Sequence, residues 1–136
     1  MALGYDLTEP LDSRIIYHFT PKHHGLIKKA SQWVIGYEEE YNLAEEIYIK
    51  IYKKQPKRYY WNVKRTNDEL KVLGMQNSNK EYIGRFDLRN NIMHGYPIDH
   101  TVDSRQKPDN KALEILMKNH KITKKELKKI SRGKVL

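Results

Sequence analysis

The chain of 136 residues contains no cysteine, which excludes disulfide bonds and thiolate metal sites and suits a reducing compartment. It also has no apolar run long enough to cross a bilayer and no secretory pattern at its start. Walker and Rossmann glycine motifs are missing as well. We therefore expect a soluble cytoplasmic protein that does not act at a membrane and that needs no cofactor.

What the chain has in excess is positive charge, much of it near the C-terminal end. The formal net charge is +9, and from Met117 onward eight Lys or Arg residues accompany a single acid, Glu126. Such a concentration of cations attracts polyanions in a salt-dependent way. RNA binding and a purely solubilising role both remain open as interpretations of this segment. The candidate RNA-binding residues are Lys124, Lys125, Lys128 and Lys129, with Arg105 in the preceding loop.

Apolar residues recur at helical spacing along most of the chain. We predict main helices over residues 11–19, 21–54, 57–73 and 79–94, and short helices over 111–118 and 124–131. Thr20-Pro21 is typical of a helix start and Gly74 of a helix stop. Thr123 and Glu126 have the spacing of a capping box. No segment has a pattern that favours a strand.

These elements predict a single all-α domain. An N-terminal arm over residues 1–10 would precede a four-helix bundle of the up-and-down type over residues 11–96. A loop and a basic helical appendage over residues 97–136 would complete the same domain.

The segment Phe86–Gly95 carries the most informative set of polar residues. Arg89, Asn90 and His94 lie close together at the end of the helix predicted over 79–94, just before Gly95. Arginine is always cationic and its forked donors suit phosphate oxygens. Histidine can take and give a proton near neutral pH. The spacing therefore favours cleavage of a phosphodiester without a metal ion.

RNA supplies its own nucleophile for such a reaction, the 2′-hydroxyl. We expect His94 to move the proton of that hydroxyl and Arg89 to neutralise charge on the phosphate. The products would carry a 2′,3′-cyclic phosphate and a 5′-hydroxyl. The reaction needs both a general acid and a general base, and each motif provides only one histidine. We therefore predict a homodimer in which two motif helices share a cleft.

The segment Arg89–His94 resembles the Arg-x4-6-His signature of the HEPN superfamily (higher eukaryote and prokaryote nucleotide-binding domains). The polar residue after the arginine and the small residue after the histidine are also similar. The resemblance implies a helical bundle that dimerises through its motif helices, with Arg89 and His94 catalytic and Asn90 supporting them. It further implies a metal-independent endoribonuclease of a toxin, antiphage or RNA-processing system, whose partner, such as an antitoxin protein, would be a separate chain.

Other interpretations of the same residues stay open. His94 could stabilise a helix C-terminus while Arg89 pairs with Asp87 or Glu81 at the surface. The chain could also be a non-catalytic HEPN-like module that binds RNA or protein. A third alternative is a small regulatory protein whose basic tail binds DNA.

Two further clusters of residues are candidates for a functional site. His18, His23 and His24 suggest a metal site, but no carboxylate cluster completes a ligand set, so we predict no bound metal. The segment Tyr59–Trp61 is flanked by Lys and Arg residues, which is typical of surfaces that bind single-stranded nucleic acid. Core packing explains at least one of these aromatic residues equally well.

Overall fold

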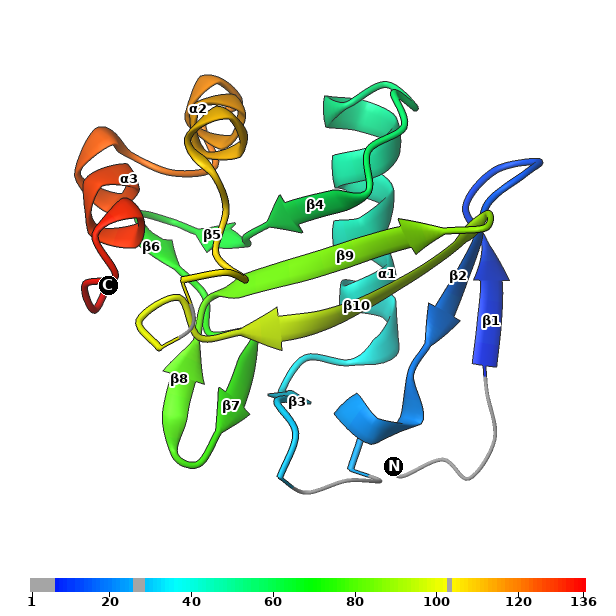
Figure 1. Ribbon diagram of the computed structural model, residues 1–136, viewed down its shortest axis with the longest axis horizontal. Helices are drawn as coiled ribbons and strands as arrows, with labels where there is room; N and C mark the ends of the chain where they lie inside the picture. The colour runs from blue at the N-terminus through cyan, green and yellow to red at the C-terminus, as the bar shows by residue number, and fades with distance from the viewer. Residues whose placement is uncertain (1–6, 26–28, 103) are drawn as a thin grey trace.

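The computed structural model describes residues 7–25, 29–102 and 104–136, and they form a mixed α/β fold. Its centre is a five-stranded sheet with the strand order β1-β2-β10-β9-β4. One long helical segment runs behind β9 and β10 (Figure 1). The predicted all-α class and its four-helix up-and-down bundle over residues 11–96 are therefore wrong.

The segment predicted to form the motif helix, residues 79–94, instead contains most of a β-hairpin. β9 (Ile83–Arg89) and β10 (Ile92–Ile98) pair antiparallel, with Arg89 opposite Ile92. The two turn residues, Asn90 and Asn91, have positive φ angles of 54° and 63°. A two-residue turn with both φ values positive matches the right-handed twist of the strands that it joins. Asparagine tolerates these positive φ angles better than most residues do. Because an α-helix requires negative φ angles, the chain cannot continue as a helix through this turn.

The other strands of the main sheet are short. β1 (Leu7–Pro10) pairs antiparallel with β2 (Ile16–Phe19), and β4 (Tyr59–Asn62) pairs antiparallel with β9. β2 lies parallel to β10, with Met93 opposite Tyr17. This parallel pair joins an early part of the chain to a late one. The helices predicted over residues 11–19 and 57–73 are therefore also wrong.

The helix predicted over residues 21–54 is confirmed only for its later part. α1 (Tyr37–Glu45) begins directly after Gly36 and continues as a π-helical segment, η2 (Glu46–Ile51). A 3₁₀ turn, η1 (Pro21–His23), and the short strand β3 (Gln32–Trp33) occupy part of the earlier region.

The hydrophobic core lies between the main sheet and the helix. Leu43, Ala44, Ile47 and Tyr48 of the helical segment are buried, as are Tyr17, Tyr60, Phe86 and Met93 of the strands. Gly95 allows the Phe86 ring to lie close to the backbone of β10. A Cβ atom at Gly95 would come within 2.5 Å of that ring, so the close approach requires glycine.

Two small sheets extend the molecule. β3, β7 (Gly74–Gln76) and β8 (Asn79–Glu81) form one, and β5 (Arg65–Thr66) with β6 (Glu69–Leu70) forms the other. Gly74, expected to end a helix, instead lies in β7 against Pro97, where a Cβ atom would come within 2.3 Å of the proline ring.

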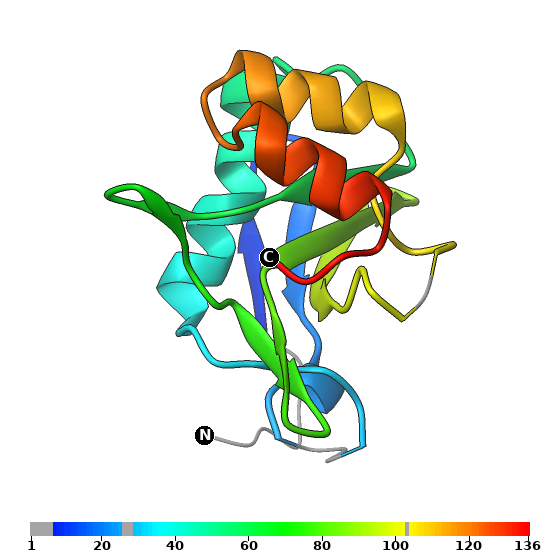
Figure 2. The ribbon, with the colours of Figure 1, turned by 90° about the vertical axis from the view of Figure 1, so that its left-hand side faces the viewer.

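The two C-terminal helices are confirmed. α2 (Asn110–Lys118) is capped by the Asp109 side chain, and α3 (Lys124–Ser131) begins with the predicted capping box of Thr123 and Glu126. Figure 2 shows both helices side by side at the end of the molecule opposite the β7–β8 hairpin. None of the described helices has the length and apolar character that a membrane span requires.

Glu81, at the end of β8, makes stability depend on pH. Its Oε2 accepts a hydrogen bond from Ser31 Oγ at 2.8 Å, and burial raises the pKa of the carboxyl group from 4.5 to about 7. Because the folded chain binds this proton more tightly than the unfolded chain, the stabilisation is complete below pH 4.5 and is lost as the pH rises through the folded pKa.

We expect Glu81→Gln to raise the free energy of unfolding at about pH 8 by up to ~3 kcal/mol. Glutamine keeps an acceptor for Ser31 and carries no charge. Urea unfolding of both proteins at about pH 8 and pH 4.5 measures the effect. An equal difference at the two pH values would contradict the assigned cause.

Candidate functional site

The main sheet has one face covered by the helix. The opposite face, which we call the open face, is covered only in part, by His23 on Tyr96 and by the Gln106 backbone on Trp61. Strand register assigns side chains to these faces, because directly paired residues share a face and successive residues alternate. Phe86 and Gly95 are paired and lie on the helix side, together with Tyr17. The open face therefore carries the alternate residues of each strand: His18 of β2, Arg85, Asp87 and Arg89 of β9, His94 and Tyr96 of β10, and Tyr59 and Trp61 of β4.

Two histidines lie side by side on the open face. Met93 is opposite Tyr17 in the parallel β2–β10 pair, so the next residues along, His94 and His18, are cross-strand neighbours. Their ring centroids are 6.0 Å apart and the rings are tilted by 42°. His94 is exposed and His18 is half-buried. Two imidazoles this close can act on the same small group.

The surroundings of His94 favour its neutral form. Partial burial lowers the pKa of His94 below its ordinary value of 6.5, and the charges of His18 and Lys22 lower it further. Asp87, opposite His94 in the β9–β10 pair, acts in the other direction. The net shift is downward, so His94 is unprotonated at neutral pH and can accept a proton.

The structure brings Arg89 to the same face as His94. Arg89 is opposite Ile92, two residues before His94 on β10, and its side chain is exposed. Such diagonal neighbours on an antiparallel pair are about 7–8 Å apart, within reach of a long side chain. Asn90 lies in the hairpin turn with a positive φ. Asparagine tolerates a positive φ angle, so the geometry of the turn explains why this residue type occurs at position 90.

Arg85 lies against three aromatic rings. Its guanidinium carbon is 4.1 Å from the ring centre of Tyr59, 5.7 Å from that of Trp61 and 6.0 Å from that of Tyr96. Its Nε donates to Asp87 Oδ1 at 3.1 Å. Stacking on aromatic faces holds a guanidinium in place while leaving its edge available.

The remaining histidines of the early segment have separate roles. His23 stacks on Tyr96 with ring centroids 5.3 Å apart, and burial lowers the pKa of His23 to about 4. His24 Nε2 is 2.6 Å from Oε1 of Glu40, which is buried and also accepts a hydrogen bond from Tyr17. Within residues 7–25, 29–102 and 104–136, no three His, Asp or Glu side chains are grouped as metal ligands.

The predicted RNA-binding residues divide into two groups. Lys124, Lys125, Lys128 and Lys129 lie on α3, at the end of the molecule opposite β1 and β2 (Figure 1), so the structure does not bring them to the histidine pair. Arg105 lines a cavity that Arg85 of the open face also lines.

The sequence predicts no catalytic or RNA-binding role for His18 and Arg85 of the open face or for Lys22 of η1. It indicates His18 only as a possible metal ligand. The alternation of Arg85 and Asp87 with the apolar residues Phe86 and Leu88 has the period of a strand, and this signal identifies the two faces of β9. The pairing of His18 with His94 leaves no comparable signal in the sequence.

Comparison with known proteins returned no match among protein-family models, curated proteins or solved structures. The HEPN resemblance of residues Arg89–His94 therefore stays a prediction, and the helical setting that it implied for them is replaced by the β9–β10 hairpin.

Proposed function

We propose that the open face cleaves RNA without a metal ion, with His94 as general base and His18 as general acid. The observation that carries this proposal is the pair of imidazoles 6.0 Å apart on the open face, where His94 is exposed and His18 is half-buried. An in-line displacement at phosphorus places the attacking and leaving oxygens on opposite sides. Each catalytic group must come within about 2.6–3.2 Å of its oxygen, and two neighbouring rings can flank a phosphate in this way.

The proposed step conserves atoms and charge. Neutral His94 takes the proton of the 2′-hydroxyl as its oxygen attacks the adjacent phosphorus. The bond from phosphorus to the 5′-oxygen breaks, and protonated His18 gives its proton to that oxygen. The products carry a 2′,3′-cyclic phosphate and a 5′-hydroxyl.

Two cations border the histidine pair and support this chemistry. Arg89 lies diagonally from His94 on the same face, and Lys22 is close enough for its charge to act on the His94 ring. Negative charge grows on the phosphate oxygens as the new bond forms, and fixed cations stabilise it. We assign Arg89 and Lys22 to this role.

This arrangement supplies both proton-transfer groups from one chain. The expectation of a composite site between two copies arose because the motif contains a single histidine, and His18 now provides the second. The homodimer, the antitoxin partner and the toxin or antiphage setting stay predictions on which the proposed chemistry does not depend.

RNA binding without cleavage is the second candidate function. The stacking of Arg85 against Tyr59, Trp61 and Tyr96 favours it, because aromatic and cationic side chains together form binding surfaces for single strands. Incubation of the purified protein with total RNA in EDTA separates the two. Fragments ending in a 2′,3′-cyclic phosphate support cleavage, whereas intact RNA with measurable binding supports the second candidate.

The proposed base predicts how the cleavage rate changes with pH. His94 must be neutral to accept a proton, and its pKa lies below 6.5 because of partial burial and the neighbouring His18. We expect the rate to rise with pH on the acidic side of its profile, in proportion to the neutral fraction of His94, with the midpoint of this rise below pH 6.5. Initial rates between about pH 4.5 and pH 7 measure the curve, and a midpoint above 6.5 would contradict the assignment.

A further inference from the structure

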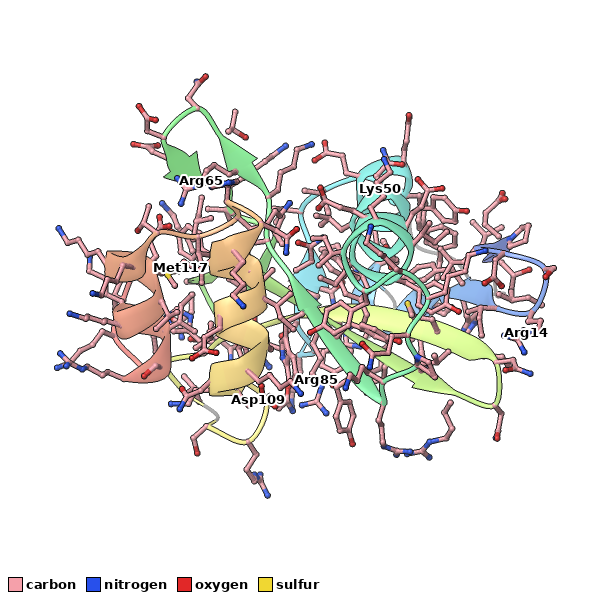
Figure 3. The ribbon with its side chains drawn as sticks, turned by 90° about the horizontal axis from the view of Figure 1, so that it is seen from above. Arg14, Lys50, Arg65, Arg85, Asp109 and Met117 are labelled. Carbon is pink, nitrogen blue, oxygen red and sulfur yellow. The ribbon has the colours of Figure 1, made fainter. Side chains whose placement is uncertain are left out.

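A cavity of about 410 Å³ lies beside Arg85, at the end of the open face away from the histidine pair. Tyr59, Trp61 and Arg85 of the sheet line one side of it, and Arg105, Lys107 and Asn110 line the other. Figure 3 shows Arg85 and Asp109 near each other, on the side of the sheet opposite the helix that carries Lys50. The volume is within the range of small-molecule sites.

Arg85 is the central group of this cavity. The residue is only 9% exposed. Its Nε is bound to Asp87, while its two terminal nitrogens have no hydrogen-bond acceptor among the described residues. Arg85 already forms an ion pair with Asp87, and its terminal N–H groups remain as donors for the oxygens of a second anion. The stacked rings of Tyr59 and Trp61 keep the guanidinium directed along this face.

The rest of the lining adds positive charge. Arg105 and Lys107 both border the cavity, and the N-terminal end of α2 contributes the positive end of the helix dipole. Asp109, which caps α2 by accepting a hydrogen bond from the Ala112 backbone at 2.8 Å, is the one carboxylate among the lining residues, against the three cations Arg85, Arg105 and Lys107. The lining therefore favours an anion over a cation.

The aromatic residues of the lining suit a nucleobase. Tyr59 is half-buried at the surface, whereas Trp61 is 8% exposed and its Nε1 donates to the Gln106 carbonyl at 2.8 Å. Base-on-aromatic stacking contributes about 1–3 kcal/mol per base and tolerates any sequence. Tyr59 is the more accessible of the two rings.

We propose that this cavity is a second RNA subsite, which binds a phosphate at Arg85 and Arg105 and stacks the adjoining base on Tyr59. The inference rests on the proposed function, because it extends the RNA strand beyond the histidine pair. Arg85 is opposite Tyr96, two residues from His94 on β10. That offset corresponds to about 7 Å along the strands and about 4.8 Å across them, so a short RNA segment reaches from one subsite to the other.

The test uses the full chain and a fluorescent single-stranded RNA of about twelve nucleotides with 2′-O-methyl riboses, which cannot be cleaved through the 2′-hydroxyl. We expect Arg85→Met to weaken binding about tenfold at low salt and to reduce the salt slope by about one. Lys50→Met removes the same charge from the opposite side of the molecule and is expected to change affinity less than about twofold.

A second variant keeps the subsite testable if Arg85→Met does not fold. Arg105 is exposed, so Arg105→Gln is expected to keep the melting temperature of the wild type and still to weaken binding. Wild-type affinity in a folded Arg85→Met protein and in Arg105→Gln would overturn the subsite. Equal losses in Lys50→Met would also overturn it, because they would indicate a general charge effect.

The outcome is separable from that of the proposed function. If the chain binds the oligonucleotide through Arg85 but leaves total RNA intact in EDTA, the subsite stands and the cleavage proposal fails. If RNA is cleaved but the Arg85 and Arg105 variants bind as the wild type does, cleavage stands and the subsite fails.

Discussion

Replacing His94 with glutamine is expected to lower the rate of RNA cleavage by about 10²–10⁴-fold, the usual contribution of a general acid or base. Glutamine keeps a polar group of similar reach but cannot take up the proton of the 2′-hydroxyl. His18→Gln is expected to cause a loss of similar size, because a 5′-oxygen that leaves unprotonated is a poor leaving group. Initial rates with a fluorogenic RNA in EDTA measure both effects.

The double variant identifies whether the two histidines act in one step. Groups that act as a unit are not additive, so His18→Gln combined with His94→Gln is expected to lose little more than either single change. His120, exposed in the turn between α2 and α3, provides the matched control, and His120→Asn is expected to cleave as the wild type does. Full activity in His94→Gln would contradict the assignment of the base.

Replacing Phe86 with alanine is expected to lower the free energy of unfolding by about 3–5 kcal/mol. The side chain is fully buried and packs between Tyr17 of β2 and Trp33 of β3, with ring centroids 6.2 Å from each. Its loss leaves a cavity that Gly95, directly opposite on β10, has no side chain to fill.

Chemical denaturation at neutral pH measures this loss. Val34→Ala is the control, because Val34 is 54% exposed and its truncation is expected to cost less than about 0.5 kcal/mol. A loss below about 1 kcal/mol in Phe86→Ala would contradict the placement of this ring at the centre of the core.

The fold could be predicted from the sequence only where local signals were unambiguous. Helix α3 has a capping box that no strand could use. The segment from Tyr82 to Met93 is different, because its apolar residues fit helical spacing and its charged residues Arg85 and Asp87 fit strand alternation. Asn90-Asn91 decides between the two, since two successive residues tolerant of positive φ favour a tight hairpin.

Of the candidate site, the sequence predicts only that Arg89 and His94 lie near each other, and the reason is geometric. Arg89 and His94 are close in sequence, so both a helix and a tight hairpin bring them near each other, and the predicted pairing of Arg89 with His94 did not depend on choosing the correct element. The hairpin places them on one face. His18 reaches His94 only through the parallel pairing of β2 with β10, and no local pattern specifies which distant strand becomes a neighbour.

That parallel pairing also determines when the site can exist. Contacts between segments distant in sequence form late, since the intervening chain must first lose its freedom. During synthesis β2 emerges early, yet its histidine has no neighbour until β10 has left the ribosome and closed the sheet. A ribosome-bound fragment that ends before β10 therefore carries only one of the two histidines proposed to transfer protons, and the proposed cleavage activity is expected only once the sheet is complete.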